Sequence, residues 1–230
     1  MLTYIGTPTA RRFCAFGSAW SPSGTVAVWS AMAANGSVDF FEAQFQRQVA
    51  AREFTLNPFE EVALPYLTGH VLDLGCGLGN LSVAAARRGC EVVAVDASPT
   101  AVDRLSRVSQ AEKLRLTAVQ CDMQQFEVGE TFDVVVAIGL LMFFPRQVAL
   151  ELLDKVQRAV RPGGCAVVNV LVQGTTFMDM FDGDRYCLFG PGELEAAFTD
   201  WTTLLARQDE FPAPNGTVKR FATIIARKPK

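Results

Sequence analysis

The residues best suited to chemistry lie in one short stretch, DLGCGLGN, at residues 73–80. It stands between an apolar segment and a segment with helical spacing, so we expect a loop that joins a strand to a helix. Glycines in such a loop let the backbone turn tightly and approach a ligand without a Cβ in the way. The candidate ligand-binding residues here are Asp73, Gly75, Cys76, Gly77 and Asn80.

Further candidate residues end the apolar segments that follow. Asp96 and Ala97 come roughly twenty residues after the loop, where a carboxylate can accept hydrogen bonds from both ribose hydroxyls. Asp122 ends the next segment and is placed to bind an adenine amino group, with Met123 packed on the ring. Any one aspartate could merely cap a helix, but ligands bind open sheets beyond the carboxyl ends of their strands, where all of these residues fall.

The loop favours S-adenosylmethionine (SAM) over a nicotinamide dinucleotide. Asn80 stands where the dinucleotide fingerprint has its third glycine, and the acidic Asp73 precedes the loop. A pyrophosphate needs backbone donors at a helix N-terminus, whereas the ammonium and sulfonium of SAM favour carboxylates and carbonyls. Ile138, at the end of a later segment, is expected to bring backbone carbonyls near the methionyl end. A nicotinamide-dependent oxidoreductase is the less favoured alternative.

The loop belongs to an alternation of strand and helix patterns, which predicts a parallel sheet with helices on both faces. Two alternating runs near the C-terminus flank Asn215-Gly216, a hairpin signal, so we expect the sheet to end in an antiparallel pair. The predicted helices span residues 78–88, 146–160 and 193–198, with another that starts at Pro99. The predicted strands span residues 71–74, 91–96, 114–121, 132–138, 165–172, 202–210 and 218–227.

The first residues differ from the rest. Residues 1–37 are rich in Gly, Ser, Pro and Ala without a sustained period, so we interpret them as an N-terminal extension, either a mobile tail or the product of a mis-assigned start. The catalytic domain is then residues 38–230. Arg11-Arg12 and Ala31-Met32-Ala33 loosely resemble a twin-arginine export signal. Residues 22–24 interrupt its apolar region, and SAM is made in the cytosol, so a cytoplasmic location is favoured.

Aromatic residues at helical spacing follow, from Asp39 to Phe59. They predict one or two short amphipathic helices that pack on the main domain. Core packing is the favoured role of these rings. The alternative is a lid in which Phe41, Phe45 or Phe54 covers the cofactor.

Composition limits the kinds of ligand and partner that we expect the protein to bind. The chain has 230 residues, half of them hydrophobic, which suits one core, and its net charge of −3 offers no broad cationic face for nucleic acid. Six scattered cysteines without a CxxC pair indicate a reducing compartment and no structural zinc, and we treat the single histidine, His70, as structural. No apolar run approaches the ~20 residues that a bilayer requires. We expect a small-molecule substrate and no metal, membrane or nucleic acid; the sequence leaves the oligomeric state open.

Five motifs, taken in order, resemble those of class I SAM-dependent methyltransferases from about Leu56 onward. The resemblance implies an α/β Rossmann-like fold: a doubly wound seven-stranded sheet, mostly parallel, with a C-terminal antiparallel hairpin. It also implies SAM as methyl donor and S-adenosylhomocysteine as product. The motifs are Val71 to Gly77, Asp96, Cys121-Asp122-Met123, Phe132 to Val135 and Arg161-Pro162-Gly163-Gly164.

A second, looser set of motifs resembles the tellurite-resistance methyltransferase branch of that superfamily. This resemblance implies a compact single-domain enzyme and a small, chalcogen-centred acceptor. The N-terminal extension and the candidate lid segment, residues 39–59, depart from the pattern and leave the acceptor open. The motifs are Leu141-Met142-Phe143, Gly192-Glu193-Leu194, Arg220 to Thr223 and Ala226 to Lys228.

Methyl transfer from a sulfonium is an in-line displacement, so alignment and exclusion of water supply most of the rate and a dedicated base is optional. A thiol, a chalcogen oxyanion or another small nucleophile could accept the group. Residues 138–144 are apolar and lack an Asn-Pro-Pro-Tyr-type motif, which argues against amide or base N-methylation.

Acceptor contacts are expected from the N-terminal helix, residues 142–146 and residues 177–189. In the last segment, Arg185 and Tyr186 are the orienting candidates, although a solvated loop with an ion pair to Asp182 or Asp184 is the simpler interpretation. A protein that binds SAM without catalysis is a further alternative.

Overall fold

The computed structural model describes residues 14–15, 36–181 and 183–230. The export-signal motifs, Asp182 and most of the predicted extension therefore lie outside the described residues. The parts of the extension that are described are the short strand β1 (Cys14–Ala15) and residues 36–37. Within the described ranges no helix combines the length and apolar character that a membrane crossing needs.

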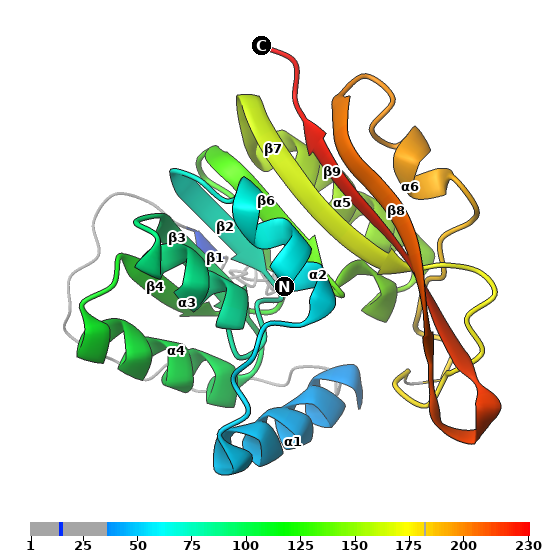
Figure 1. Ribbon diagram of the computed structural model, residues 1–230, viewed down its shortest axis with the longest axis horizontal. Helices are drawn as coiled ribbons and strands as arrows, with labels where there is room; N and C mark the ends of the chain where they lie inside the picture. The colour runs from blue at the N-terminus through cyan, green and yellow to red at the C-terminus, as the bar shows by residue number, and fades with distance from the viewer. Residues whose placement is uncertain (1–13, 16–35, 182) are drawn as a thin grey trace, which may run out of the picture.

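A seven-stranded sheet forms the centre of the fold (Figure 1). Its five leading strands pair in parallel, and the last two join antiparallel, which confirms the α/β Rossmann-like fold predicted from the sequence. Buried parallel strands need apolar side chains on both faces, as the valine-rich segments supply. The spatial order is β4 (Leu116–Gln120), β3 (Glu91–Asp96), β2 (His70–Leu74), β6 (Phe132–Ile138), β7 (Val160–Leu171), β9 (Val218–Arg227) and β8 (Thr202–Pro212).

Helices cover both faces of this sheet and divide its core in two. On one face, α2 (Pro58–Ala63), α3 (Asn80–Arg87) and α4 (Pro99–Glu112) pack on alternate strand residues such as Val134 and Val136. The intervening residues face α5 (Arg146–Ala159) and α6 (Glu193–Ala196) on the other side. The parallel pairing brings the carboxyl ends of these strands, and the loops beyond them, to one edge of the sheet.

The N-terminal helix α1 (Gly36–Ala51) lies apart from the sheet in Figure 1 and runs beside α4. Its Glu42 carboxylate accepts hydrogen bonds from the hydroxyls of Ser98, at 2.5 Å, and Thr100 at the start of α4. With α2, it accounts for the helices predicted between Asp39 and Phe59. The helix begins two residues before the predicted domain boundary at residue 38.

Most predicted elements are present, and two features differ from the prediction. The strand expected from Cys165 begins at Val160, because Val160 already pairs with Phe132 ahead of a bulge. Gly164 permits this course, since a Cβ there would lie 2.7 Å from the Asp133 carbonyl oxygen. The sequence also gave no sign of β5 (Phe126–Glu127), which pairs in parallel with β1.

The predicted hairpin turn is present. Asn215 and Gly216 take positive φ angles of 58° and 70°, as a tight hairpin requires, within the 3₁₀ helix η3 (Pro214–Gly216). Two other 3₁₀ helices are η1 (Leu64–Tyr66) and η2 (Leu141–Phe143), the second of which follows β6 directly.

Two of the three leucines of α5 allow a matched test of the core. Leu153 is 4% exposed and packs under the sheet, whereas Leu150 is 40% exposed on the same helix. We expect Leu153→Ala to lower the free energy of unfolding by about 2–5 kcal/mol, because it leaves a cavity. Leu150→Ala should change it by less than about 0.5 kcal/mol. Urea denaturation followed by circular dichroism measures both, and equal effects would contradict this packing.

Candidate functional site

A cavity of about 390 Å³ opens at the carboxyl ends of β2, β3 and β6. Its volume lies within the range of about 300–1,000 Å³ for small-molecule sites. Every residue that the sequence predicted to bind a cofactor lines it: Asp73, Gly75, Cys76, Gly77, Asn80, Asp96, Ala97, Asp122, Met123 and Ile138.

The glycine turn is fixed to the end of the neighbouring strand. The backbone N–H groups of Gly75 and Cys76 both donate to the Val95 carbonyl, at 2.8 and 3.1 Å. Gly75 has a φ of 64°, and a Cβ on it would lie 2.7 Å from Leu140. Gly77 has a φ of 52° and would bring a Cβ within 3.1 Å of the Phe45 ring. Positive φ favours glycine at both positions, and a larger residue would also force Leu140 or Phe45 to shift.

Asp96 joins this turn to the start of α4. Its two carboxylate oxygens accept backbone hydrogen bonds from Gly77 and Ser98, each at 2.8 Å. Burial raises the pKa of Asp96 above its ordinary value, although these hydrogen bonds oppose the shift. Each oxygen keeps a further lone pair, so the carboxylate can also accept from a ligand such as a ribose diol. Asp96 thus lies beside the Gly75 turn, as the sequence predicted.

Asp73 forms a buried acidic floor to the cavity. Ser82 donates its hydroxyl to the Asp73 carboxylate at 2.6 Å. Burial, together with the neighbouring Glu60 and Asp96 carboxylates, raises the pKa of Asp73 to about 7. Burial also raises the pKa of Glu60, whose carboxylate accepts from the Asn57 backbone at 2.7 Å in a capping box.

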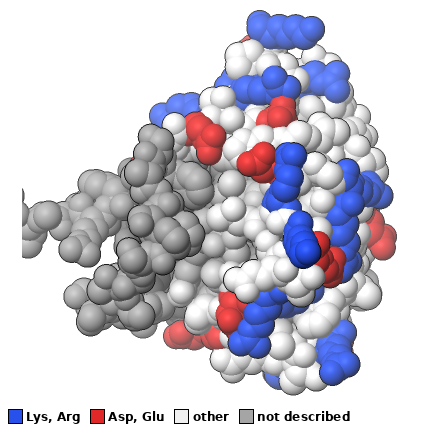
Figure 2. Space-filling view, turned by 90° about the vertical axis from the view of Figure 1, so that its left-hand side faces the viewer, with Lys and Arg blue, Asp and Glu red and all other residues white. Residues whose placement is uncertain are grey.

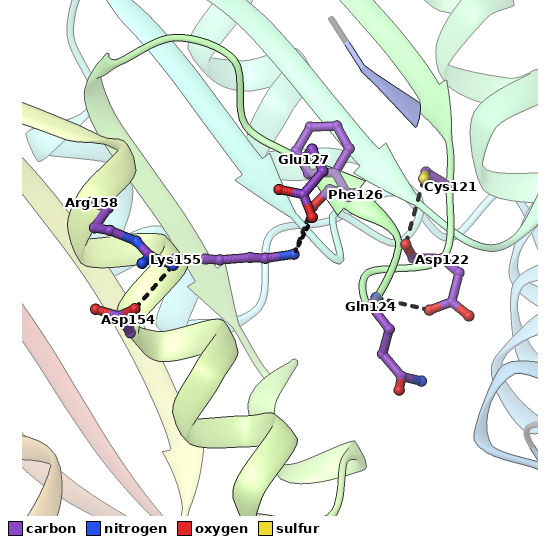
Figure 3. Close-up of polar contacts among 8 residues, drawn as sticks. All are labelled: Cys121, Asp122, Gln124, Phe126, Glu127, Asp154, Lys155 and Arg158. Carbon is purple, nitrogen blue, oxygen red and sulfur yellow. Dashed lines mark hydrogen bonds and ion pairs between the residues drawn. The ribbon is translucent and has the colours of Figure 1, made fainter. Parts of the chain in front are cut away.

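Asp122 is held by the loop after β4, shown in Figure 3. The Gln124 backbone N–H donates to the Asp122 carboxylate at 2.9 Å. The Asp122 side chain thus turns toward Gln124 rather than toward α5. Lys155 reaches from α5 to the Phe126 carbonyl, at 2.9 Å, and also pairs with Glu127. The lysine therefore supports the loop from the opposite side and leaves Asp122 on the cavity wall.

The cavity is acidic. The described residues that line it include four carboxylates, Glu60, Asp73, Asp96 and Asp122, and no lysine, arginine or histidine. By contrast, Figure 2 shows acidic and basic side chains interspersed on the described part of another face. Such a wall favours a cationic ligand and disfavours a pyrophosphate. The described residues hold no cluster of three or more His, Cys, Asp or Glu side chains with the geometry for a metal ion.

Helix α1 supplies a roof. Phe41 and Phe45 line the cavity, as the lid alternative supposed, whereas Phe54 lies outside it under the guanidinium of Arg104, 4.0 Å from the ring centre. Several polar residues that line the cavity were not predicted from the sequence: Gln44, Gln48, Asn57 and Glu60. For Asn57 and Glu60, the Asn-x-x-Glu spacing of a capping box was an available signal.

The two acceptor-orienting candidates lie beyond the cavity. Arg185 is exposed, and neither it nor Tyr186 is among the described lining residues. Tyr186 stacks on Phe181, with ring centres 4.7 Å apart, and Phe181 contacts Phe143 on the cavity wall. A role for Arg185 or Tyr186 in acceptor binding stays a prediction.

Comparison with known proteins agrees with this geometry. Residues 71–164 match the family model described as a methyltransferase domain. A carboxy-S-adenosyl-L-methionine synthase from Geobacter metallireducens is 31% identical over 57% of this chain and 57% of its own length. The probable S-adenosyl-L-methionine-dependent methyltransferase TehB from Haemophilus influenzae is 26% identical over 69% of this chain and 57% of its own. The chain thus spans little more than half the length of these curated relatives.

Solved structures share the fold. The crystal structure of TehB from H. influenzae superposes with a TM-score of 0.67 at 21% identity, over 84% of this chain and 67% of the other. A 1,6-didemethyltoxoflavin-N1-methyltransferase from Burkholderia thailandensis superposes with a TM-score of 0.59 at 20% identity, over 88% and 94% of the two chains.

The strand order defines a Rossmann-like fold with a cavity at the carboxyl ends of its parallel strands. With the matching methyltransferase domain over residues 71–164, the chain resembles the class I SAM-dependent methyltransferases, among them TehB. These findings support the resemblance predicted from the sequence motifs.

The raised pKa of Asp73 makes stability depend on pH. In the folded state its pKa of about 7 lies above the ordinary value of 3.8, so the native protein holds a proton that the unfolded chain releases. Its contribution is fully present below about pH 4 and is lost as the pH rises through 7. We expect the free energy of unfolding of the ligand-free protein to fall by about 3 kcal/mol from pH 5 to pH 8.

Asp73→Asn should remove most of this fall, because the amide keeps the acceptor for Ser82 and cannot ionise. Asp200→Asn, at an exposed position, is the control and should keep the wild-type slope. Urea unfolding at each pH measures the effect. An unchanged slope in Asp73→Asn would show that another group carries it.

Proposed function

We propose that this protein binds SAM in the acidic cavity and transfers its methyl group to a small-molecule acceptor by in-line displacement. One observation supports the proposal above the others: a glycine turn hydrogen-bonded to a strand end sits in a cavity walled by carboxylates without a described cation. SAM combines a nucleoside with a sulfonium and an ammonium that together outweigh its one carboxylate, so it matches both halves of that description.

The residues present fit the cofactor. Asp96 would accept the ribose hydroxyls, and Asp122 would accept from the adenine amino group while Met123 packs on the ring. Asp73 and the carbonyls near Ile138 would face the methionyl end. The buried Asn80 side-chain oxygen has no hydrogen-bond partner among the described residues, and an ammonium group would satisfy it.

When bound, SAM supplies an activated methyl group on a good leaving group. The chain's own residues then need to align an acceptor and keep water away, rather than to transfer a proton. Phe41 and Phe45 from α1 cover the cavity, and Phe143 and Phe144 follow the end of β6. These apolar side chains exclude water beside the acidic wall. A thiol, a chalcogen oxyanion or another small nucleophile remains the sequence-based range of acceptors.

Three alternatives make different predictions. A nicotinamide-dependent oxidoreductase would bind a pyrophosphate, which the four carboxylates repel. A carboxy-SAM synthase, the activity named for the Geobacter relative, would hold an added carboxylate that meets no described cation in the cavity. A non-catalytic protein would bind SAM without turnover.

Calorimetric titration with S-adenosylhomocysteine tests the cofactor site. We expect the wild type to bind it, and Asp96→Asn to bind it about 10–100-fold more weakly, because hydrogen bonds to a charged acceptor are lost. Asp103→Asn, exposed on α4, removes the same charge elsewhere and should leave the affinity unchanged. NAD⁺ should give no heat of binding. Tighter binding of NAD⁺ than of S-adenosylhomocysteine would refute the proposal.

A turnover screen then separates an enzyme from a binding protein. SAM is incubated with small thiols, phenols, amines, selenite and tellurite, and released S-adenosylhomocysteine is measured. We expect release above the acceptor-free rate for at least one class. Mass analysis of the products distinguishes a methylated acceptor from carboxylated SAM. Binding without release across the screen would favour the non-catalytic alternative.

A further inference from the structure

The cavity has an aromatic wall as well as an acidic one. Phe41 and Phe45 come from α1, and Phe143 and Phe144 come from the segment after β6. The rings of Phe41 and Phe143 meet edge to face, with centres 4.9 Å apart and planes at 84°. This contact joins the roof helix to the segment that follows β6.

The wall is held from behind by more rings. Phe143 lies 5.4 Å from Phe181, which in turn stacks on Tyr186 at 4.7 Å. Next to them Met142, Leu171 and Met180 form a small buried cluster. The position of Phe143 is therefore set by packing on two sides, and a flat ring pressed against it would meet a rigid surface.

No described cation faces this space. Arg146 forms an ion pair with Glu193, and Lys219 lies over the Phe177 ring, 4.5 Å from its centre and outside the cavity lining. Arg185 is exposed and outside it too. An oxyanion in the cavity would be desolvated beside four carboxylates without a partner, which is strongly unfavourable.

The charge of the wall also separates neutral nucleophiles from acidic ones. A phenol or a thiol attacks as its anion, and nearby carboxylates raise its pKa and so reduce the fraction of that anion. An amine attacks as its neutral form, and its product is a cation that the same carboxylates stabilise. The acidic wall therefore favours nitrogen, and the aromatic wall favours a planar ring.

We propose that the methyl acceptor is an aromatic amine without a negatively charged group, held against Phe41 and Phe143. This inference rests on the proposed function. The nitrogen lone pair forms the new N–C bond while the C–S bond breaks and leaves its electron pair on sulfur. The N-methylammonium product then loses one proton to solvent water, so charge and atoms balance.

Matched acceptors test the charge and the nucleophile. With SAM present, S-adenosylhomocysteine release is measured for 4-aminobenzamide, 4-aminobenzoate, 4-hydroxybenzamide and selenite. We expect kcat/KM for 4-aminobenzamide to exceed that of each of the others at least about tenfold. The aminobenzoate differs from the amide chiefly in its charge, and the hydroxybenzamide differs only in its nucleophile. Preferred turnover of selenite, the carboxylate or the phenol would overturn the proposal.

A charge placed on the roof should change this preference. Gln44 lines the cavity from α1, so Gln44→Arg adds a cation there, whereas Ala43→Arg adds it at an exposed position of the same helix. We expect Gln44→Arg to raise the ratio of kcat/KM for aminobenzoate over aminobenzamide about tenfold. Ala43→Arg should leave the ratio at the wild-type value. Equal ratios in the two variants would show that the acceptor does not meet this wall.

A second pair of variants tests the aromatic wall. Phe143→Leu should raise KM for 4-aminobenzamide about fivefold, because ring contacts are lost, with little change in affinity for S-adenosylhomocysteine. Phe211→Leu, on β8 and outside the cavity lining, is the control. If the wild type binds S-adenosylhomocysteine but turns over no aromatic amine, the acceptor proposal fails alone. If it binds no S-adenosylhomocysteine, the proposed function itself fails.

Discussion

The site depends on the hydrogen bonds that hold the glycine turn to the end of β3. Val95 provides one carbonyl for two N–H groups, and Asp96 provides a carboxylate for a third. These bonds join two strands through a turn whose positive φ angles favour glycine, so the cavity floor is ordered before any ligand enters. The Asp96 carboxylate is already oriented by the Gly77 and Ser98 backbone, and a ligand meets it without having to order it.

This arrangement has an electrostatic cost. Asp73, Glu60 and Asp96 all have pKa values raised by burial, and the Asp73 and Glu60 carboxylates repel each other. A cation that enters relieves this repulsion and lowers those pKa values, so binding and proton release are coupled. The ligand-free protein thus holds, within the cavity, unfavourable charge that a sulfonium and an ammonium would offset. A ligand of the same shape without a positive centre would gain nothing from it.

Sequence analysis predicted the parts of the site whose form is set locally. A buried strand, a glycine with positive φ and an aspartate at a strand end each have a signature within a few residues, so Asp73, Gly75 and Asp96 were found. Gln44 and Gln48 were missed, because helix α1 reaches the cavity through contacts with α4 and η2 that are distant in sequence. The early start of β7 depends likewise on a contact that is distant in sequence, the pairing of Val160 with Phe132. This pairing outweighs the tendency of Pro162 and the two glycines after it to interrupt regular structure.

The division of the cavity between sheet and roof has a consequence for specificity. The residues proposed to bind the cofactor stand at or just after strand ends, within the segment 71–164 that matches the methyltransferase domain. The roof residues Phe41, Gln44 and Phe45 lie outside that segment, and so do Phe181 and Tyr186 behind Phe143. Substitutions in α1 can therefore change the surface that an acceptor meets while the bonds between the glycine turn and β3 stay intact. A change at Asp96 cannot be confined in this way, because the same carboxylate holds the turn and faces the ligand. Acceptor choice can accordingly vary independently of cofactor binding in this fold.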